Sequence, residues 1–300
     1  MFRDDIWDDL PEQHFPDDEG YIAVLRCYVD ASTRDEGLLT VAGYLFESGS
    51  VRRFRQEWRD TFGRENFSWA DLIARSKQFR HLRDDRAEHD RLVAAGVGLV
   101  RKYVIAGTIA SIWQQDVKDF GPTWIRGFGH AYSIAGHMAM GGMGDWARRN
   151  NLRGGIAYVI EEGDDGYDEL GHLLSYAPKS PVVREMYQWS GHSTTPKTPS
   201  SPFHAPDLFA WEWGKYVVET AIEEKRLMRL SFANLLRDKL HAYMLMPLHG
   251  EPLMRFFRSV HALGVEQLQE NAEALQSVQP VDLTDGVRSS EQPERGEGPE

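Results

Sequence analysis

Residues 21–47, YIAVLRCYVDASTRDEGLLTVAGYLFE, contain two apolar runs that are separated by a polar turn. The runs at 21–30 and 38–47 are rich in β-branched residues, Leu and Tyr, which favours two buried strands. The Ser, Asp and Gly residues at 31–37 are typical of a short connection. This stretch therefore predicts an antiparallel pair of strands, and the other elements are placed outward from it.

The rest of the chain alternates between helical and strand patterns. A helix is expected at 48–62, where Ser48 or Ser50 could cap it, and a helix rich in Gly, Ala and Met at 127–149 suggests close approach of its backbone to the sheet. The other expected elements are an irregular segment at 64–83, helices at 84–102, 166–177 and from 206, strands at 103–112, 155–166 and 182–190, a loop at 191–202, and helices at 231–246 and 251–275. This order predicts an α/β fold in which helices cover both faces of a mixed sheet.

Composition excludes several classes of protein. The chain has 300 residues, 41% of them hydrophobic, and a single cysteine, Cys27, which excludes an internal disulfide framework and a cysteine-rich zinc site. No apolar run is long enough for a membrane span, and the acidic start lacks the features of a secretory signal, so a cytoplasmic location is expected. The expected organisation is an acidic leader at 1–20, a main domain at 21–230, a helical extension at 231–275 and a disordered tail at 276–300.

The net charge of −12 is concentrated at the two ends of the chain. Residues 52–86 differ, because they carry ten Lys and Arg against six Asp and Glu, with Trp58, Trp69 and Phe79 between them. Such a segment could form a nucleic-acid surface or simply a solvated, Arg-rich helix face. Nucleic acid is therefore retained as a partner that residues 52–86 would contact.

Acidic side chains stand where several strands end or helices begin: Asp30, Asp71, Glu161 with Glu162, and Asp207. Ligands of α/β sheets gather beyond the carboxyl ends of the strands, so these are candidate ligand residues. Simpler interpretations stay open. Asp30 could form an Asx turn, the two glutamates could lie in a solvated loop, and the other two aspartates could stabilise helix starts. Strand alternation places Glu161 and Glu162 on opposite faces, so one of them is expected to face the site.

The segment around Asp207 carries two further signals. Ala210 and Gly214 follow it at helical spacing, so this face of the helix can lie close to the sheet and direct Asp207 toward the strand ends. His204 could assist proton transfer at such a site. Alternatively, it is a loop histidine that is hydrogen-bonded to the backbone.

Four short motifs in this order resemble a known family. CYVDAST at 27–33, ENFSWADLIAR at 65–75, AYVIEEGD at 157–164 and SPFHAPDLFAWEW at 201–213 are similar to the motifs of the bacterial and phage domain-of-unknown-function 3800 family. The resemblance covers about residues 21–225. It implies a ribonuclease-H-like fold, with additional C-terminal helices in this chain, and by analogy a metal-dependent nuclease.

By position, Asp30, Asp71 and Asp207 match aspartates of the family motifs, and the third acid is Glu161 or Glu162. The implied mechanism is phosphodiester hydrolysis by two divalent cations about 4 Å apart, with Asp30 bridging both ions. Oxygen ligands favour Mg²⁺ or Mn²⁺ over zinc.

The chain also departs from the family pattern. Ala31 stands where the family has glutamate, Thr33 where it has glycine, and Asn66 and Ser68 where it has Glu and His. These differences favour an alternative hypothesis, a catalytically inactive scaffold or adaptor with the same fold. A nuclease requires its acids within about 5 to 8 Å of each other, as shared cations demand.

Overall fold

The computed structural model describes residues 25–120, 131–152, 154–163, 166–175, 177–222, 228–237, 241–247, 250, 252, 253 and 255. Its centre is a six-stranded sheet in the order β5-β4-β1-β2-β3-β6. The strands are β1 (Leu25–Thr33), β2 (Leu38–Glu47), β3 (Val104–Trp113), β4 (Ile156–Glu162), β5 (Trp189–Pro196) and β6 (His241–Leu245). β2 is antiparallel to β1 and β3, β4 runs parallel to β1, β5 to β4, and β6 to β3.

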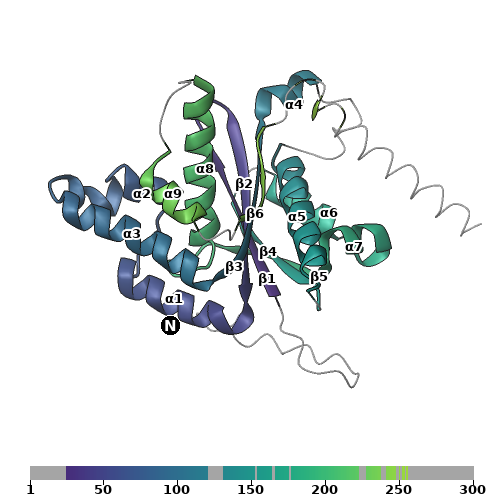
Figure 1. Cartoon of the computed structure of the whole chain (residues 1–300), viewed down its shortest axis with the longest axis horizontal. Helices are drawn as coiled ribbons and strands as arrows, with labels where there is room; N and C mark the ends of the chain where they lie inside the picture. Colours follow the sequence, from purple (N-terminus) through teal and green to yellow (C-terminus); the bar gives the residue numbers. More distant parts are fainter. Residues whose placement is uncertain are drawn as a thin grey trace, which may run out of the picture. The chain divides into compact units, whose positions relative to one another are not determined.

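Helices cover both faces of this sheet (Figure 1). One face carries α1 (Ser48–Phe62), α2 (Trp69–Ile73), α3 (Arg86–Tyr103), α8 (His204–Ile222) and α9 (Leu230–Leu236). The other carries α5 (Ala131–Arg149), α6 (Tyr167–Leu174) and α7 (Pro181–Tyr187), and α4 (Gln114–Phe120) follows β3. The predicted α/β fold, a mixed sheet with helices on both faces, is therefore confirmed. None of the helices in the described ranges is long and apolar enough to cross a membrane.

The central strand β2 shows why the sequence folds this way. Every residue of β2 except the last is buried, because α8 packs on one of its faces and α5 on the other. A strand that is buried on both faces must be apolar throughout, as LLTVAGYLFE nearly is. On the α8 side, the ring of Tyr28 forms T-shaped pairs with Phe46 and Phe203 at centroid distances of 5.7 and 5.5 Å. This aromatic cluster joins β1 and β2 to the loop that leads into α8.

The start of α1 differs from the prediction. The N-cap residue is Glu47, whose side chain makes no capping hydrogen bond, and the helix begins at Ser48. Ser50 instead donates its hydroxyl to the Glu47 carbonyl oxygen at 2.8 Å. The predicted cap by Ser48 or Ser50 is therefore wrong, because a hydroxyl inside the first turn can reach back to a carbonyl as readily as it can accept from an amide.

The segment 64–83 was predicted to be irregular, but it contains α2 and a 3₁₀ helix at Lys77–Arg83. Ser68 accepts a hydrogen bond from the Asp71 amide, and Asp71 accepts one from the Ser68 amide, each at 3.3 Å. This reciprocal pair is a capping box in which aspartate replaces the usual glutamate. The short pattern SWAD is therefore a helix start, which agrees with the alternative of a capping role for Asp71 but not with the irregular segment predicted at 64–83.

Residues 182–190, predicted as a strand, mostly form α7. Ser180 caps this helix by accepting from the Val183 amide, Pro181 occupies its first position, and Gln188 ends it in the left-handed conformation. The strand prediction relied on two adjacent valines, which favour a strand. The residues that mark the start and the end of a helix received too little weight.

β5 occupies much of the loop predicted at 191–202. It pairs with β4 at the edge of the sheet, and its residues are half-buried rather than buried. An edge strand of this kind tolerates Ser, Thr and a terminal proline, so its composition resembles that of a loop.

The helix predicted at 231–246 is also only partly correct. α9 occupies its first half, and the second half forms β6, which adds a strand to the opposite edge of the sheet. The extension at 231–275 is thus not purely helical. The predictions for 1–20 and 276–300, and most of the helix predicted at 251–275, lie outside the described residues.

Candidate active site

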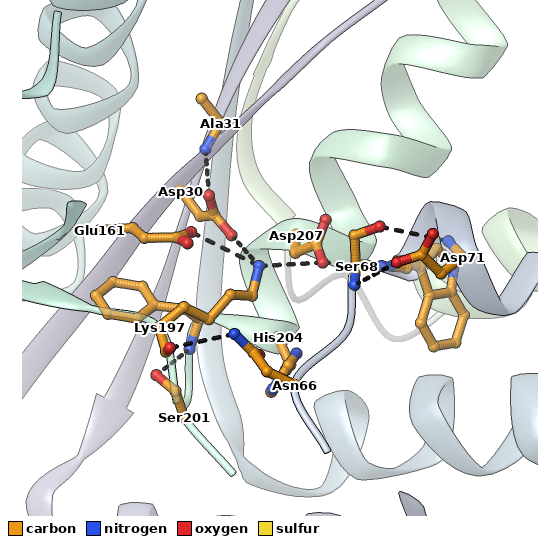
Figure 2. A network of polar contacts seen from close by, with 12 residues as sticks. Asp30, Ala31, Asn66, Ser68, Asp71, Glu161, Lys197, Ser201, His204 and Asp207 are labelled. Carbon is orange, nitrogen blue, oxygen red and sulfur yellow. Dashed lines mark hydrogen bonds and ion pairs between the residues drawn. The ribbon is translucent and has the colours of Figure 1, made fainter. Parts of the chain in front are cut away.

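Asp30 and Glu161 lie next to each other at the ends of two parallel strands. The register of β1 and β4 pairs Val29 with Ile160 at its last step, so Asp30 and Glu161 follow as neighbours. Residues in register on parallel strands point to the same face of the sheet. Figure 2 shows both carboxylates directed toward the start of α8. The sequence did not show whether Glu161 or Glu162 faces the site. In the structure it is Glu161 that faces the start of α8.

Asp207 reaches the same place from the first turn of α8. This helix packs against β1 and β2. A Cβ atom added to Gly214 would lie 3.3 Å from the Thr40 hydroxyl on β2, and Ala210 is fully buried. The predicted strip of small residues therefore does let α8 lie close to the sheet, and this approach carries Asp207 to the strand ends.

The three carboxylates converge on the side chain of Lys197, which follows β5 (Figure 2). The Lys197 Nζ atom is 2.9 Å from Asp30 Oδ2, 3.1 Å from Asp207 Oδ2 and 3.6 Å from Glu161 Oε2. Because all three oxygens lie within 3.6 Å of the same nitrogen atom, any two of them are less than about 8 Å apart. The three carboxylates therefore meet the separation of about 5 to 8 Å that shared cations require. The Lys197 side chain is only 12% exposed, so these ion pairs are largely removed from solvent.

Backbone amides hold two of the carboxylates in place. Ala31 donates its amide to Asp30 Oδ1 at 2.7 Å, and Trp69, at the start of α2, donates its amide to Asp207 Oδ2 at 2.9 Å. Hydrogen bonds from amides to an ionised carboxylate are strong and directional. The positions of Asp30 and Asp207 are therefore set by the backbone as well as by Lys197.

Burial and charge act against each other in this cluster. Burial alone would lower the pKa of the Lys197 ammonium, but the charges of Asp207, Asp30 and Glu161 outweigh it and raise that pKa above its ordinary value. Burial raises the pKa of the Asp207 carboxyl, and the charge of Lys197 offsets this only in part. The ammonium is thus firmly protonated, whereas burial favours the neutral form of Asp207.

Glu162 and Asp71, both predicted as ligands, are placed elsewhere. Glu162 follows Glu161 on β4, so strand alternation directs it to the opposite face of the sheet. Burial would raise the pKa of Asp71, but hydrogen bonds from Lys77, Ser68 and Ser76 lower it below its ordinary value. Figure 2 shows Asp71 beyond Ser68 and away from Lys197. The capping interpretation of Asp71 is therefore the one that its contacts support.

His204 is buried between aromatic rings and does not contact the carboxylates. Its ring stacks on Trp58 and Phe67, each at a centroid distance of 5.0 Å. Its Nε2–H donates to the carbonyl oxygens of Thr198 and Pro199 at 3.1 and 3.2 Å. Burial, with a smaller effect of the nearby ammonium, lowers its pKa to about 3. These contacts match the alternative of a loop histidine that is bonded to the backbone.

Lys197 itself was missed by the sequence analysis, which treated TTPKTPSSP as part of a Ser, Thr and Pro loop. One signal was present, because Lys197 is the only Lys or Arg between 185 and 214. A single basic residue that precedes an expected acidic helix start is a candidate counter-ion. The pattern does not show which carboxylates it would meet.

The donor set suits Mg²⁺ or Mn²⁺, but its spacing suits an ammonium. Asp30, Glu161 and Asp207 supply only oxygen atoms, which these hard cations prefer. The contacts with Lys197, at 2.9 to 3.6 Å, are longer than the roughly 2.1 Å between Mg²⁺ and its ligands. In the described part of the chain, no three His, Cys, Asp or Glu side chains are already arranged to hold a metal ion. The oxygen donors of these residues therefore suit a hard divalent ion in kind, whereas the Lys197 ammonium occupies the position among them.

The basic segment 52–86 lies beside this cluster. Asn66 donates its side-chain amide to the Lys197 carbonyl oxygen at 3.2 Å, and Arg59 donates to the Ser200 hydroxyl at 3.2 Å. Six arginines of the segment are exposed, namely Arg52, Arg53, Arg64, Arg80, Arg83 and Arg86. Its aromatic residues are different: Trp58, Trp69 and Phe79 are buried in the core. They cannot serve as stacking platforms for bases, so only the charge of this segment remains available to a polyanion.

Comparison with known proteins supplies no family. No family model matches the chain, and no curated protein is significantly similar to it in sequence. Among solved structures, a chain of the PCNA:RNase HII complex from Archaeoglobus fulgidus is similar to this protein with 12% identity and a TM-score of 0.36. The similarity covers 70% of this chain and 82% of that one.

Proposed function

We propose that this protein hydrolyses phosphodiester bonds of nucleic acid with the help of Mg²⁺ or Mn²⁺. The observation that carries the proposal is the convergence of Asp30, Glu161 and Asp207, from β1, β4 and α8, within 3.6 Å of one cationic atom. A site that already holds one positive charge among three carboxylates is electrostatically suited to another cation. The resemblance of the four sequence motifs to the domain-of-unknown-function 3800 family supports the same proposal.

Each residue has a defined part in this proposal. Asp30, Glu161 and Asp207 would hold the ion, which would supply an activated water and stabilise charge on the phosphate. The amides of Ala31 and Trp69 orient two of the carboxylates. Partial burial excludes water and strengthens these electrostatic interactions. The exposed arginines of 52–86 attract the nucleic-acid backbone.

The proposal is tested with two neighbouring substitutions on β4. Purified wild type, Glu161→Gln and Glu162→Gln are incubated with single- and double-stranded DNA and RNA in Mn²⁺, in Mg²⁺ and in EDTA. We expect metal-dependent cleavage that Glu161→Gln reduces about 100-fold or more, since each 1.4 kcal/mol of lost transition-state stabilisation costs tenfold in rate. Glu162→Gln points to the other face and should stay within about threefold of wild type. Equal loss in both variants would contradict the assigned site.

A catalytically inactive scaffold is the second candidate function. The observation that favours it is Lys197, whose ammonium already partly neutralises the carboxylates. Ala31 and Thr33, where the resembling family has glutamate and glycine, point the same way. Folded wild type that cleaves no nucleic acid in either metal would support the scaffold and overturn the nuclease proposal.

A further inference from the structure

We propose that Lys197 fills one of the two cation positions of this site, so that the site takes up a single divalent ion. This inference rests on the proposed function, in which Asp30, Glu161 and Asp207 bind Mg²⁺ or Mn²⁺. It assigns to Lys197 a role as a positioning residue that holds the carboxylates and limits the number of ions.

The first argument is the geometry of the ammonium. A lysine ammonium has three N–H donors and no acceptor. Lys197 Nζ has three carboxylate neighbours, Asp30, Asp207 and Glu161, at 2.9, 3.1 and 3.6 Å. The ammonium therefore has one carboxylate neighbour for each of its three N–H donors. The three carboxylates surround it as ligands surround a bound cation. Each carboxylate offers about four lone-pair sites on two oxygens, so contact with Lys197 does not exhaust its capacity to bind an ion.

The second argument is charge. Three carboxylates and one ammonium together carry a charge of −2, which one divalent cation neutralises. A second divalent cation beside Lys197 would leave a surplus of +2 in a site where the Asp30 side chain is only 2% and the Asp207 side chain 9% exposed. Uncompensated charge in such surroundings is costly. Without Lys197, the same three carboxylates would carry a charge of −3, so a second divalent ion would leave a surplus of only +1 instead of +2.

The third argument is that the chain holds Lys197 in position. Asn66 anchors its carbonyl oxygen, and His204 binds the carbonyls of the next two residues, Thr198 and Pro199. Pro196, directly before Lys197, restricts the backbone further. The loop is thus fixed on both sides of the lysine, and the ammonium is directed into the cluster.

The test counts bound ions rather than measuring activity. Mn²⁺ is titrated calorimetrically into the full-length wild type, Lys197→Met and a control, Lys77→Met. Methionine has nearly the length of lysine without its charge. Lys77 also forms an ion pair with a carboxylate, Asp71, at 3.1 Å, but its side chain is 71% exposed and outside the cluster. We expect one Mn²⁺ per chain for wild type and for Lys77→Met, and two for Lys197→Met.

In Lys197→Met three close carboxylates lose their counter-ion, and this loss can unfold the variant when no metal is present. In that case Mn²⁺, but not NaCl at equal ionic strength, should restore the cooperative melting transition. Wild type that binds two ions, a variant that binds the same number as wild type, or a variant that Mn²⁺ does not restore would each overturn the inference. Two ions in an active wild type would leave the proposed function intact, whereas folded wild type that binds none would overturn both.

Discussion

His204 illustrates how burial decides the role of a residue whose position in the sequence suggested catalysis. It lies three residues before Asp207, yet its ring is packed between Trp58 and Phe67. Its Nε2–H donates a hydrogen bond to the backbone of the loop that carries Lys197. With its pKa lowered to about 3, the imidazole is neutral throughout the range in which enzymes usually work. It can position the loop, but it cannot exchange protons with a substrate that it does not face.

Substitution of His204 by phenylalanine tests this role. His204→Phe keeps a ring between the two aromatic side chains but leaves the carbonyls of Thr198 and Pro199 without their donor. We expect a loss of about 1 to 3 kcal/mol in the free energy of unfolding. The pH profile of the cleavage rate between pH 5 and 9 should keep its shape. Disappearance of an acidic or basic limb in the variant would instead make His204 a proton-transfer residue.

The individual site residues differ in how far the sequence could predict them. Asp30 and Asp207 were predictable, because a strand end and a Pro-containing helix start define their places locally. The choice between Glu161 and Glu162 was not predictable. Alternation along the strand places them on opposite faces of the sheet, but it does not show which face α8 covers. Lys197 was less predictable still: its hydrogen bond to Asp30 joins residues 167 positions apart. Such a contact depends on the folded loop and not on any local pattern.

Among the elements, α5 shows where small residues matter. The sequence analysis expected the backbone of this glycine-rich helix to approach the sheet. α5 does pack on β2 and β3, but its closest approach at Gly144 is to α7, because an added Cβ atom would lie 2.0 Å from the Met186 carbonyl oxygen. At Gly141 the added atom would meet nothing within 4 Å. The same helix therefore contains one glycine that packing requires and one that it does not.

The two glycines form a matched pair of substitutions. Gly141→Ala should raise the free energy of unfolding by about 0.5 to 1 kcal/mol, because alanine has the better helix propensity. Gly144→Ala should lower it by about 1 to 3 kcal/mol, because a backbone carbonyl cannot move aside as a flexible side chain can. Denaturant unfolding of both variants measures the difference. Equal effects at the two positions would show that α5 and α7 are not packed in this way.

The elements that the sequence predicted well are those with strong local patterns. β2, α1 and α3 have apolar periodicity and clear ends, and they agree with the structure to within a few residues. β5 and β6 do not, because each is an edge strand whose pairing with one neighbour, rather than its composition, makes it a strand. Edge position is a property of the whole sheet, so no window along the chain contains it.

At the scale of the whole molecule, neutral histidines lie on both sides of the sheet, and they are either buried, as His204 is, or half-buried. Besides His204 near α8, His137 on α5 is hydrogen-bonded to the Tyr187 hydroxyl, and His241 on β6 to the Tyr44 hydroxyl at 2.7 Å. Burial lowers the pKa of both His137 and His241 to about 4. In the unfolded chain these histidines titrate near their ordinary value of about 6.5. Folding therefore excludes protons that the unfolded chain binds.

This difference predicts a loss of stability in mild acid. A group whose pKa is lower in the folded than in the unfolded state stabilises the fold above the unfolded pKa and loses that contribution as the pH falls. Each of the three histidines should cost about 1.4 kcal/mol per pH unit from roughly pH 6.5 down to its folded pKa. Melting temperatures measured from pH 7.5 to pH 4.5 should therefore fall, most steeply below pH 6.

The histidine contribution is isolated with a double variant, since Asp207 and Glu212, whose pKa values are raised by burial, act in the opposite sense. His137→Gln with His241→Gln should be less stable than wild type at pH 7.5, because packing and two hydrogen bonds are altered. Its melting temperature should nevertheless change less between pH 6.5 and pH 4.5, because two of the proton-excluding groups are gone. His81→Gln, which replaces an exposed histidine, should keep the wild-type slope. If the double variant also keeps that slope, the acid sensitivity arises elsewhere, and the buried histidines do not couple folding to pH.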